Sequence, residues 1–212
     1  DFKPEYFEIV NKLSGYDAVI ATGSNNSARY FEAYFGKYPN IIRKNRNSVA
    51  VLEGTESESD LQKLGEDIFK YYGLGCRNVS KIYVPKGYVF EPLMQTLHEF
   101  KSIVLNEKYK NNFDYNYALH MLNKEDFKNN GCLILKEDSA IQSRIASLHY
   151  EFFEDKADLE IDLHQNLDSI QCIVAKPGFL GLKTVEFGEA QKPKLTDYAD
   201  GVDTMEFLSN QG

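Results

Sequence analysis

Residues 73–80, with the sequence GLGCRNVS, form the most informative segment of this 212-residue chain. Upstream, residues 57–72 carry apolar side chains at helical spacing, and downstream, residues 81–85 (KIYVP) are typical of a strand. The glycines allow the backbone to turn sharply between these two elements. The sequence therefore predicts a helix, a tight turn that carries Cys76, and a strand.

A cysteine on such a turn has two interpretations. An exposed thiolate can attack a carbonyl carbon, so Cys76 is the candidate catalytic nucleophile. Alternatively, Cys76 is a small buried apolar residue, since free cysteine is among the most buried residue types. Cys132 and Cys172 lie in apolar, strand-like runs and are interpreted as core residues. None of the three cysteines has metal-ligand spacing, so no metal cofactor is expected.

A second corner lies upstream, in residues 17–29 (DAVIATGSNNSAR). It has the pattern of a buried strand, a glycine turn and a helix start, where backbone N–H groups and the helix dipole can bind an anion. Thr22, Gly23 and Ser24 are the candidate anion-binding residues. Ordinary helix capping explains the same residues without any ligand.

Taken together, the two corners resemble the aldehyde dehydrogenase superfamily. In that family a Thr-Gly-Ser corner touches the nicotinamide cofactor, and a cysteine about as far downstream as Cys76 is from Ser24 forms a thioester. Residues 16–84 are more closely similar to the acyl-CoA reductase branch, the group that includes the fatty-acyl reductase of bacterial bioluminescence. Residues 187–205 also resemble that branch, so the resemblance covers roughly half of the chain.

The resemblance implies a function. Cys76 would take the acyl group of a long-chain fatty acyl-CoA as a thioester, and a nicotinamide cofactor held at Thr22, Gly23 and Ser24 would reduce it to the aldehyde. NADPH is favoured over NADH by the resemblance alone. The family's usual assemblies imply a homo-oligomer, and an acyl-donating partner protein is a further candidate.

One departure from the wider superfamily is informative. Hydrolytic aldehyde dehydrogenases carry a Glu-Leu-Gly-Gly stretch between the two motifs, and its glutamate activates the water that cleaves the thioester. Here residues 41–48 read IIRKNRNS, and no carboxylate occurs before Glu53. Because a general base must lie within hydrogen-bond reach of its proton, this absence favours the acylating, reducing branch.

Two other functions stay open. A cysteine acyltransferase or thioesterase would pair Cys76 with a histidine, since a neighbouring imidazole lowers the pKa of a thiol. The candidates for that pairing are His98, His120, His149 and His164. A non-catalytic nucleotide-binding module is the third possibility.

Composition limits the partners and the compartment. The net charge of −8 argues against non-specific nucleic-acid binding. Arg43, Lys44 and Arg46 form a basic cluster, which is either a solvated strand end or a contact for cofactor phosphate. Unpaired thiols favour a reducing, cytoplasmic compartment. No apolar run has the length of a membrane span, so membrane insertion is not expected.

The element pattern predicts an α/β fold, with helices on both faces of a mostly parallel sheet in three αβα layers, as in the aldehyde dehydrogenase catalytic domain. Residues 1–212 are expected to form a single catalytic, thioester-forming domain, with the N-terminal cofactor-binding domain absent from this chain. Residues 109–117 are expected to be a surface loop or, alternatively, the wall of an acyl channel. The expected helices are 4–13, 26–35, 58–72, 91–100 and 115–123, and the expected strands are 17–21, 40–43, 48–52, 81–84, 132–136, 145–153 and 170–175.

Overall fold

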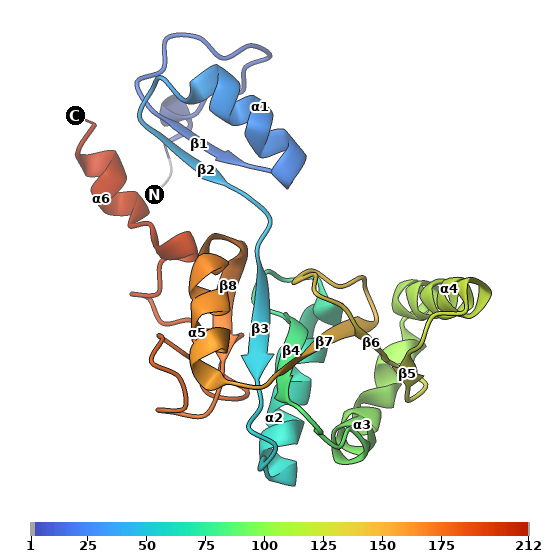
Figure 1. The fold of residues 1–212 in the computed structure, drawn as a ribbon. Coiled ribbons are helices and arrows are strands. Elements are labelled where there is room, and N and C mark those ends of the chain that lie inside the picture. Colours follow the sequence, from blue (N-terminus) through green and yellow to red (C-terminus); the bar gives the residue numbers. More distant parts are fainter. Residues whose placement is uncertain (1–2, 212) are drawn as a thin grey trace. The chain divides into compact units, whose positions relative to one another are not determined.

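The computed structural model describes residues 3–211, which divide into two compact units (Figure 1). Unit 1 comprises Asp1–Asn45 and Asp197–Gly212, and unit 2 comprises Arg46–Thr196. The expectation that residues 1–212 act as one catalytic domain stays a prediction. Unit 1 contains η1 (Pro4–Tyr6), β1 (Val19–Thr22), α1 (Asn25–Phe35), β2 (Asn40–Arg43), η5 (Ala199–Gly201) and α6 (Thr204–Ser209).

The centre of unit 2 is a six-stranded sheet with the order β5-β6-β7-β4-β3-β8. Neighbouring strands are parallel except for the short β5, which pairs antiparallel with β6. The strands are β3 (Asn47–Val51), β4 (Val79–Pro85), β5 (Lys128–Asn129), β6 (Ile134–Glu137), β7 (Ser147–Phe153) and β8 (Ile170–Val174). The helices are α2 (Glu58–Phe69), η2 (Lys70–Gly73), α3 (Glu91–His98), η3 (Glu99–Leu105), α4 (Glu107–Asn123), α5 (Lys156–Gln165) and η4 (Leu167–Ser169).

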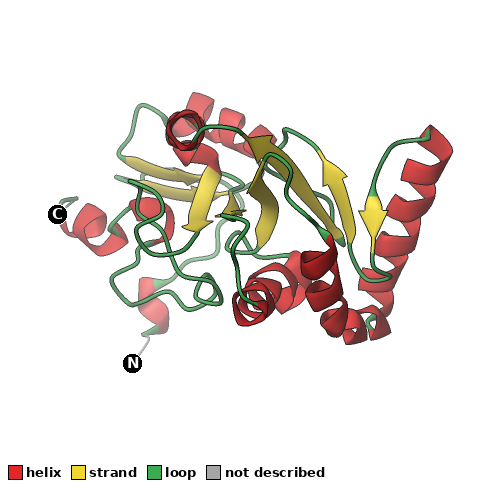
Figure 2. Ribbon diagram, turned by 60° about the horizontal axis from the view of Figure 1, so that its bottom comes forward, coloured by secondary structure: helices red, strands yellow, loops and turns green. Residues whose placement is uncertain are grey.

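The apolar run of β3 shows why the sheet is covered on both faces. Ala50 and Leu52 point into the core beneath α2 and α3, whereas Val49 and Val51 point into the core beneath α5. Successive side chains of a strand alternate between faces, so a strand buried on both sides is apolar throughout. Helices therefore lie on both sides of the strands (Figure 2), and the predicted three-layer αβα architecture is confirmed.

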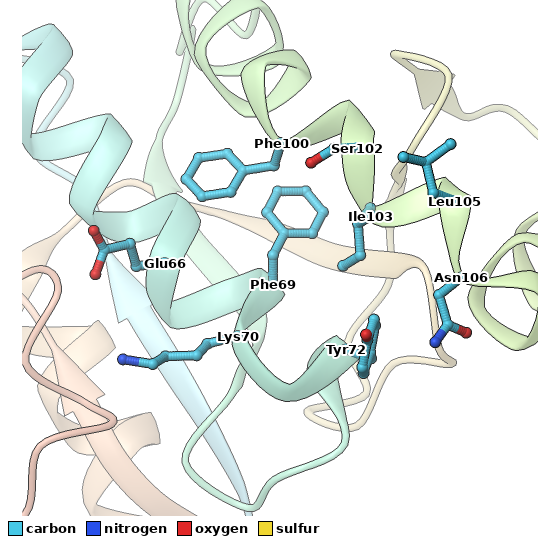
Figure 3. A pocket seen from close by; sticks show the side chains of 9 residues that line it. All are labelled: Glu66, Phe69, Lys70, Tyr72, Phe100, Ser102, Ile103, Leu105 and Asn106. Atoms are coloured by element: carbon cyan, nitrogen blue, oxygen red, sulfur yellow. The ribbon is translucent and has the colours of Figure 1, made fainter.

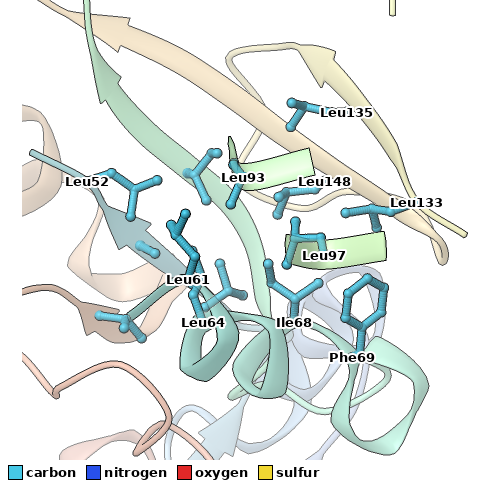
Figure 4. Packing of buried hydrophobic residues seen from close by; sticks show 14 of the residues in the cluster. Leu52, Leu61, Leu64, Ile68, Phe69, Leu93, Leu97, Leu133, Leu135 and Leu148 are labelled. Carbon is cyan, nitrogen blue, oxygen red and sulfur yellow. The ribbon is translucent and has the colours of Figure 1, made fainter. Parts of the chain in front are cut away.

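Helix α2 fixes the position at which the segment leading to Cys76 begins. Ser57 caps its first turn and forms a capping box with Asp60. Leu61, Leu64 and Ile68 then bury one face against the sheet, next to leucines of α3 (Figure 4). Burial of each such side chain stabilises the fold by roughly 1.5–3 kcal/mol, so the end of α2 has a firm position.

Unit 1 is built around one β-α-β motif. Strands β1 and β2 are parallel, and α1 connects them. Tyr16 packs edge-on against the rings of Phe35 and Tyr38 beside this motif. The C-terminal segment of the chain belongs to the same unit, because Arg43 Nη2 donates a hydrogen bond to Thr204 Oγ1 at 3.0 Å.

Three sequence expectations differ from the structure. The helix expected at residues 4–13 is wrong: only Pro4–Tyr6 is helical, and Ile9 is fully exposed, so no apolar face is available to stabilise a longer helix. The loop expected at residues 109–117 is also wrong, because these residues belong to α4. Helix α5 has no counterpart among the expected elements.

Candidate active site

Cys76 lies on the turn between η2 and β4, and it is exposed. Exposure rules out the interpretation of Cys76 as a buried core residue. Cys132 and Cys172 are buried, as predicted for core residues. Burial raises the pKa of the Cys132 thiol to about 11 and also raises that of Cys172, so both stay protonated at neutral pH. Cys76 is therefore the one accessible thiol in residues 3–211.

Asn78 holds the turn in shape. Its Oδ1 accepts a hydrogen bond from the Gly75 N–H at 2.8 Å, and the Asn78 N–H donates to the Gly75 carbonyl at 3.0 Å. Its Nδ2 donates to carbonyls at the end of α2, the nearest being that of Lys70 at 2.8 Å. The buried Asn78 amide thus ties the cysteine turn to the helix that precedes it.

Ser48 ties the same turn to the sheet. Its Oγ donates to the carbonyl of Cys76 at 3.0 Å, and its N–H donates to the carbonyl of Asn78 at 3.2 Å. The Cys76 carbonyl is therefore fixed. None of the hydrogen bonds made within the described part of the chain uses the Cys76 N–H, which leaves that donor available to a ligand.

The approach to Cys76 carries unusual backbone angles. Tyr71, Tyr72 and Gly73 have φ values of 54°, 61° and 71°. Left-handed backbone is unfavourable for bulky residues, by roughly 1–2 kcal/mol each. Such strain tends to occur at functional sites, where the surrounding structure maintains it.

Residues 188–190 of unit 2 are bonded to the turn and to α2. Arg77 Nη1 donates to the carbonyl of Ala190 at 3.1 Å and contacts Cys172 Sγ at 3.2 Å. The buried carboxylate of Asp67 accepts the N–H groups of Gly188, at 2.7 Å, and Ala190, at 3.1 Å. Burial outweighs these hydrogen bonds and raises the pKa of Asp67 to about 6. Part of the C-terminal stretch that carries the family resemblance, residues 187–191, is thereby held next to the cysteine turn through Arg77 and Asp67.

The second predicted corner lies in unit 1. Thr22 ends β1, and Ser24 is the N-cap of α1, with its Oγ accepting the Ser27 N–H at 3.1 Å. A Cβ at Gly23 would lie 2.8 Å from Cβ of Ser27, so glycine is needed for this close approach. Thr22 and Ser24 are exposed. The corner has the predicted strand-turn-helix form, and its role in cofactor binding stays a prediction.

The basic cluster is used in protein contacts. Arg43 bonds to Thr204 within unit 1, and Lys44 pairs with Glu32 at 2.7 Å. Arg46 Nε donates to the carbonyl of Asp168 at 3.0 Å in unit 2. These contacts favour a structural role over phosphate binding for the cluster.

Three of the four histidines contact other groups through Nδ1. His98 Nδ1 contacts the carbonyl of Asn130, His120 Nδ1 contacts Glu125, and His149 Nδ1 contacts the carbonyl of Ala140. No hydrogen bond joins a histidine to Cys76 in the part of the chain that the structure describes. A Cys-His pair is therefore not formed in this arrangement.

Glu53, the first carboxylate after residues 41–48, lies far from the cysteine turn. Ser48, at the start of β3, contacts Cys76, whereas Glu53 lies beyond the opposite end of this strand. At the rise of an extended strand, the distance between them along the chain is about 16 Å. Glu53 is therefore not placed to activate a water at Cys76.

Three residues in and around the turn were not singled out by motif. Arg77 and Asn78 lie in the quoted segment itself, and a buried amide directly after a glycine turn is a signal for a turn-closing side chain. Asp67 lies on the apolar face of α2, between Leu64 and Ile68. A carboxylate within an apolar stripe indicates a buried polar partner, which here is the backbone of residues 188–190.

Residues 3–211 contain no group of His, Cys, Asp and Glu side chains suited to hold a metal ion. Over the same residues, no helix has the length and apolar character needed to cross a membrane.

The fold is the aldehyde-dehydrogenase-like α/β fold. A betaine aldehyde dehydrogenase from Staphylococcus aureus, in complex with NAD+, has a TM-score of 0.52 at 12% identity, covering 80% of this chain and 43% of its own. A 1-pyrroline-5-carboxylate dehydrogenase from Thermus thermophilus has a TM-score of 0.52 at 11% identity, covering 75% and 38%. An indole-3-acetaldehyde dehydrogenase from P. syringae, in complex with NAD+, has a TM-score of 0.51 at 12% identity, covering 75% and 40%.

This chain thus spans between 38% and 43% of the length of these three proteins. No protein-family model and no curated protein matches the sequence.

Proposed function

We propose that this chain is the thioester-forming part of an NAD(P)H-dependent fatty acyl-CoA reductase. The observation that carries the proposal is the exposed Cys76 thiol on a turn held by Ser48 and Asn78, within an aldehyde-dehydrogenase-like fold. The similar structures in complex with NAD+ support a nicotinamide cofactor. A cofactor-binding domain would then be supplied outside residues 1–212.

In the proposed reaction, the Cys76 thiolate attacks the thioester carbonyl of the acyl-CoA. Coenzyme A leaves as the thiol after taking up a proton, and the acyl group stays on Cys76. The Cys76 N–H is free to stabilise the oxyanion of the tetrahedral intermediate. Nicotinamide supplies the hydride for reduction, for which we propose a site at Thr22, Gly23 and Ser24. Hydride addition and release of the Cys76 thiolate give the aldehyde.

The positions of the nearby carboxylates support reduction over hydrolysis. Glu53 lies at the far end of β3 from Cys76, and both oxygens of Asp67 accept backbone N–H groups. Neither carboxylate is placed as a general base for water. No hydrogen bond joins a histidine to Cys76 in the described residues, which likewise disfavours a cysteine hydrolase. NADPH as the preferred cofactor, a cytoplasmic location and a homo-oligomeric assembly belong to this proposal as well.

Product analysis tests the proposal. The natural full-length protein that contains this chain is incubated with hexadecanoyl-CoA and NADPH, and aldehyde is trapped as its hydrazone. We expect one NADPH oxidised and one coenzyme A released per aldehyde, and no product from a Cys76→Ala variant. Free acid without NADPH oxidation would instead establish the thioesterase alternative.

A further inference from the structure

An open groove of about 780 Å³ lies in unit 2, between the end of α2 and the segment η3 with the start of α4. Its apolar lining consists of Phe69, Tyr72, Phe100, Ile103 and Leu105 (Figure 3). Ligand pockets of proteins span roughly 300–1,000 Å³ and are lined mainly by apolar and aromatic side chains. The size and lining of this groove match such a pocket.

Two aromatic rings form one wall of the groove. Phe69 and Phe100 stack with their centroids 5.0 Å apart. Phe100 also lies directly over Gly65 of α2, where a Cβ would approach the ring to 2.2 Å. Gly65 therefore lets the Phe100 ring reach the surface of α2, and the position of this wall depends on a residue without a side chain.

The groove is close to Cys76 along the chain. Tyr72 lines it, and Cys76 follows four residues later, which limits the separation of their Cα atoms to about 14 Å. Tyr71 and Leu74 lie between them and are 62% and 67% exposed. Leu105, at the other side of the groove, is 83% exposed. Exposed apolar patches mark binding surfaces, and Tyr71 and Leu74 lie on the segment that joins the groove to the thiol along the chain.

We propose that this groove binds the aliphatic chain of the acyl group that Cys76 carries. The inference rests on the proposed function and deepens it, since it assigns the residues that select the chain length. An extended hydrocarbon chain suits the lining because its wall is aromatic and aliphatic, whereas the charged Glu66 and Lys70 lie at the side of α2 (Figure 3). Tyr71 and Tyr72, with their left-handed backbone, belong to the segment of the chain that leads from α2 to Cys76.

The first test measures binding without chemistry. A Cys76→Ala protein is titrated with cis-parinaric acid, a fluorescent C18 fatty acid. The groove variant carries Tyr72→Asn and Leu105→Asp together in this Cys76→Ala protein and is titrated in the same way. Both positions are surface-exposed, and asparagine tolerates left-handed backbone, so the fold should persist. Leu122→Asp is the matched control, since Leu122 is 81% exposed and lies outside the groove. We expect the groove variants to weaken binding at least tenfold and the control to leave it unchanged. Equal affinities in all three proteins would overturn the proposal.

The second test uses the reactive protein and separates the groove from the reaction. Acylation of Cys76 by hexadecanoyl-CoA and by butyryl-CoA is followed by intact mass. We expect the groove variants to slow acylation by the long chain at least tenfold and to leave the short chain unaffected. If Cys76 is acylated equally well in every variant, the groove assignment fails while the function stands. If Cys76 is never acylated but parinaric acid binds in a groove-dependent way, the proposed function fails and the groove is a site for a free fatty chain, not for an acyl group on Cys76.

Discussion

Asn78 supports the turn that carries Cys76. Its amide joins Gly75 on one side to the carbonyls that end α2 on the other. A buried amide of this kind specifies one turn geometry, since any other arrangement leaves several polar groups unpaired. Removing it should therefore affect both stability and the presentation of the thiol.

We expect Asn78→Ala to lower the free energy of unfolding by about 2 kcal/mol, because buried backbone groups lose their partners. Urea unfolding followed by circular dichroism measures this difference. Asn112→Ala is the control, since the half-buried Asn112 donates a single, solvent-exposed hydrogen bond within α4 and its loss should cost under about 0.5 kcal/mol. Similar losses in the two variants would show that Asn78 does not hold the turn.

The raised pKa of Asp67 predicts that the free energy of unfolding depends on pH. Its pKa is raised from 3.8 to about 6 in the folded protein, so between these values the folded state binds more protons than the unfolded state. The contribution of Asp67 to stability is present below pH 3.8 and is lost as the pH rises through about 6, by about 3 kcal/mol in total. Asp67→Asn should remove this fall, and unfolding curves at closely spaced pH values compare the two proteins. Parallel pH profiles for both proteins would contradict the assignment.

At the residue scale, the sequence was sufficient to place Cys76 on a turn between a helix and a strand, and insufficient to find the residues that support this turn. Cys76 and the Thr22-Gly23-Ser24 corner follow from local patterns of strand, turn and helix. Ser48 reaches Cys76 only because β3 and β4 pair in one particular register, with Ser48 opposite Val79. Registers between strands far apart in the sequence have no local signal.

At the scale of elements, α2 is the part of unit 2 that both the turn and the groove depend on. It begins with a capping box, buries one face against the sheet and ends where the left-handed segment starts. Gly65 is in the middle of this helix, where glycine is normally unfavourable by roughly 1 kcal/mol relative to alanine. Its presence is explained by the Phe100 ring that lies against it.

Gly65→Ala should therefore destabilise the protein in spite of its better helix propensity. The added methyl group would displace Phe100, and overpacking of this kind costs roughly 1–3 kcal/mol, more than the gain in propensity. Thermal unfolding provides the measurement. Ser59→Ala, at an exposed position of the same helix, should be neutral or slightly stabilising. Stabilisation by Gly65→Ala would contradict the described packing of Phe100.

The elements that sequence patterns predicted are those with a periodic apolar face. Strands β3, β4 and β7 and helix α2 are near the expected positions. Helix α4 was missed over residues 109–117 because its buried side is polar, formed by Tyr109, Asn116 and His120. In α5 the apolar residues of 159–163 alternate, yet Ile161 is exposed, so the sequence pattern has the wrong period.

At the scale of the whole molecule, the two candidate motifs belong to different compact units, the corner to unit 1 and the thiol to unit 2. Acylation and hydride transfer should therefore be separable by mutation. Acylation of Cys76 reports on unit 2, and aldehyde formation with NADPH reports on the corner of unit 1.

Gly23→Ala is the variant for unit 1, because its Cβ would clash with Ser27 at 2.8 Å and disturb the corner. We expect aldehyde formation to fall at least tenfold, with a raised KM for NADPH, while acylation of Cys76 in the absence of cofactor continues. Steady-state kinetics in the full-length protein and intact mass of the acyl-enzyme measure the two steps. Equal loss of both steps would indicate general unfolding and would not support a cofactor role for this corner.

The most direct test of the central claim is the mass of the chain after incubation with hexadecanoyl-CoA, without cofactor, followed by peptide mapping. The proposed function predicts one hexadecanoyl group on Cys76, retained in Cys132→Ala and absent from Cys76→Ala. Folded protein that shows no adduct with any acyl-CoA would contradict a thioester-forming role for this cysteine.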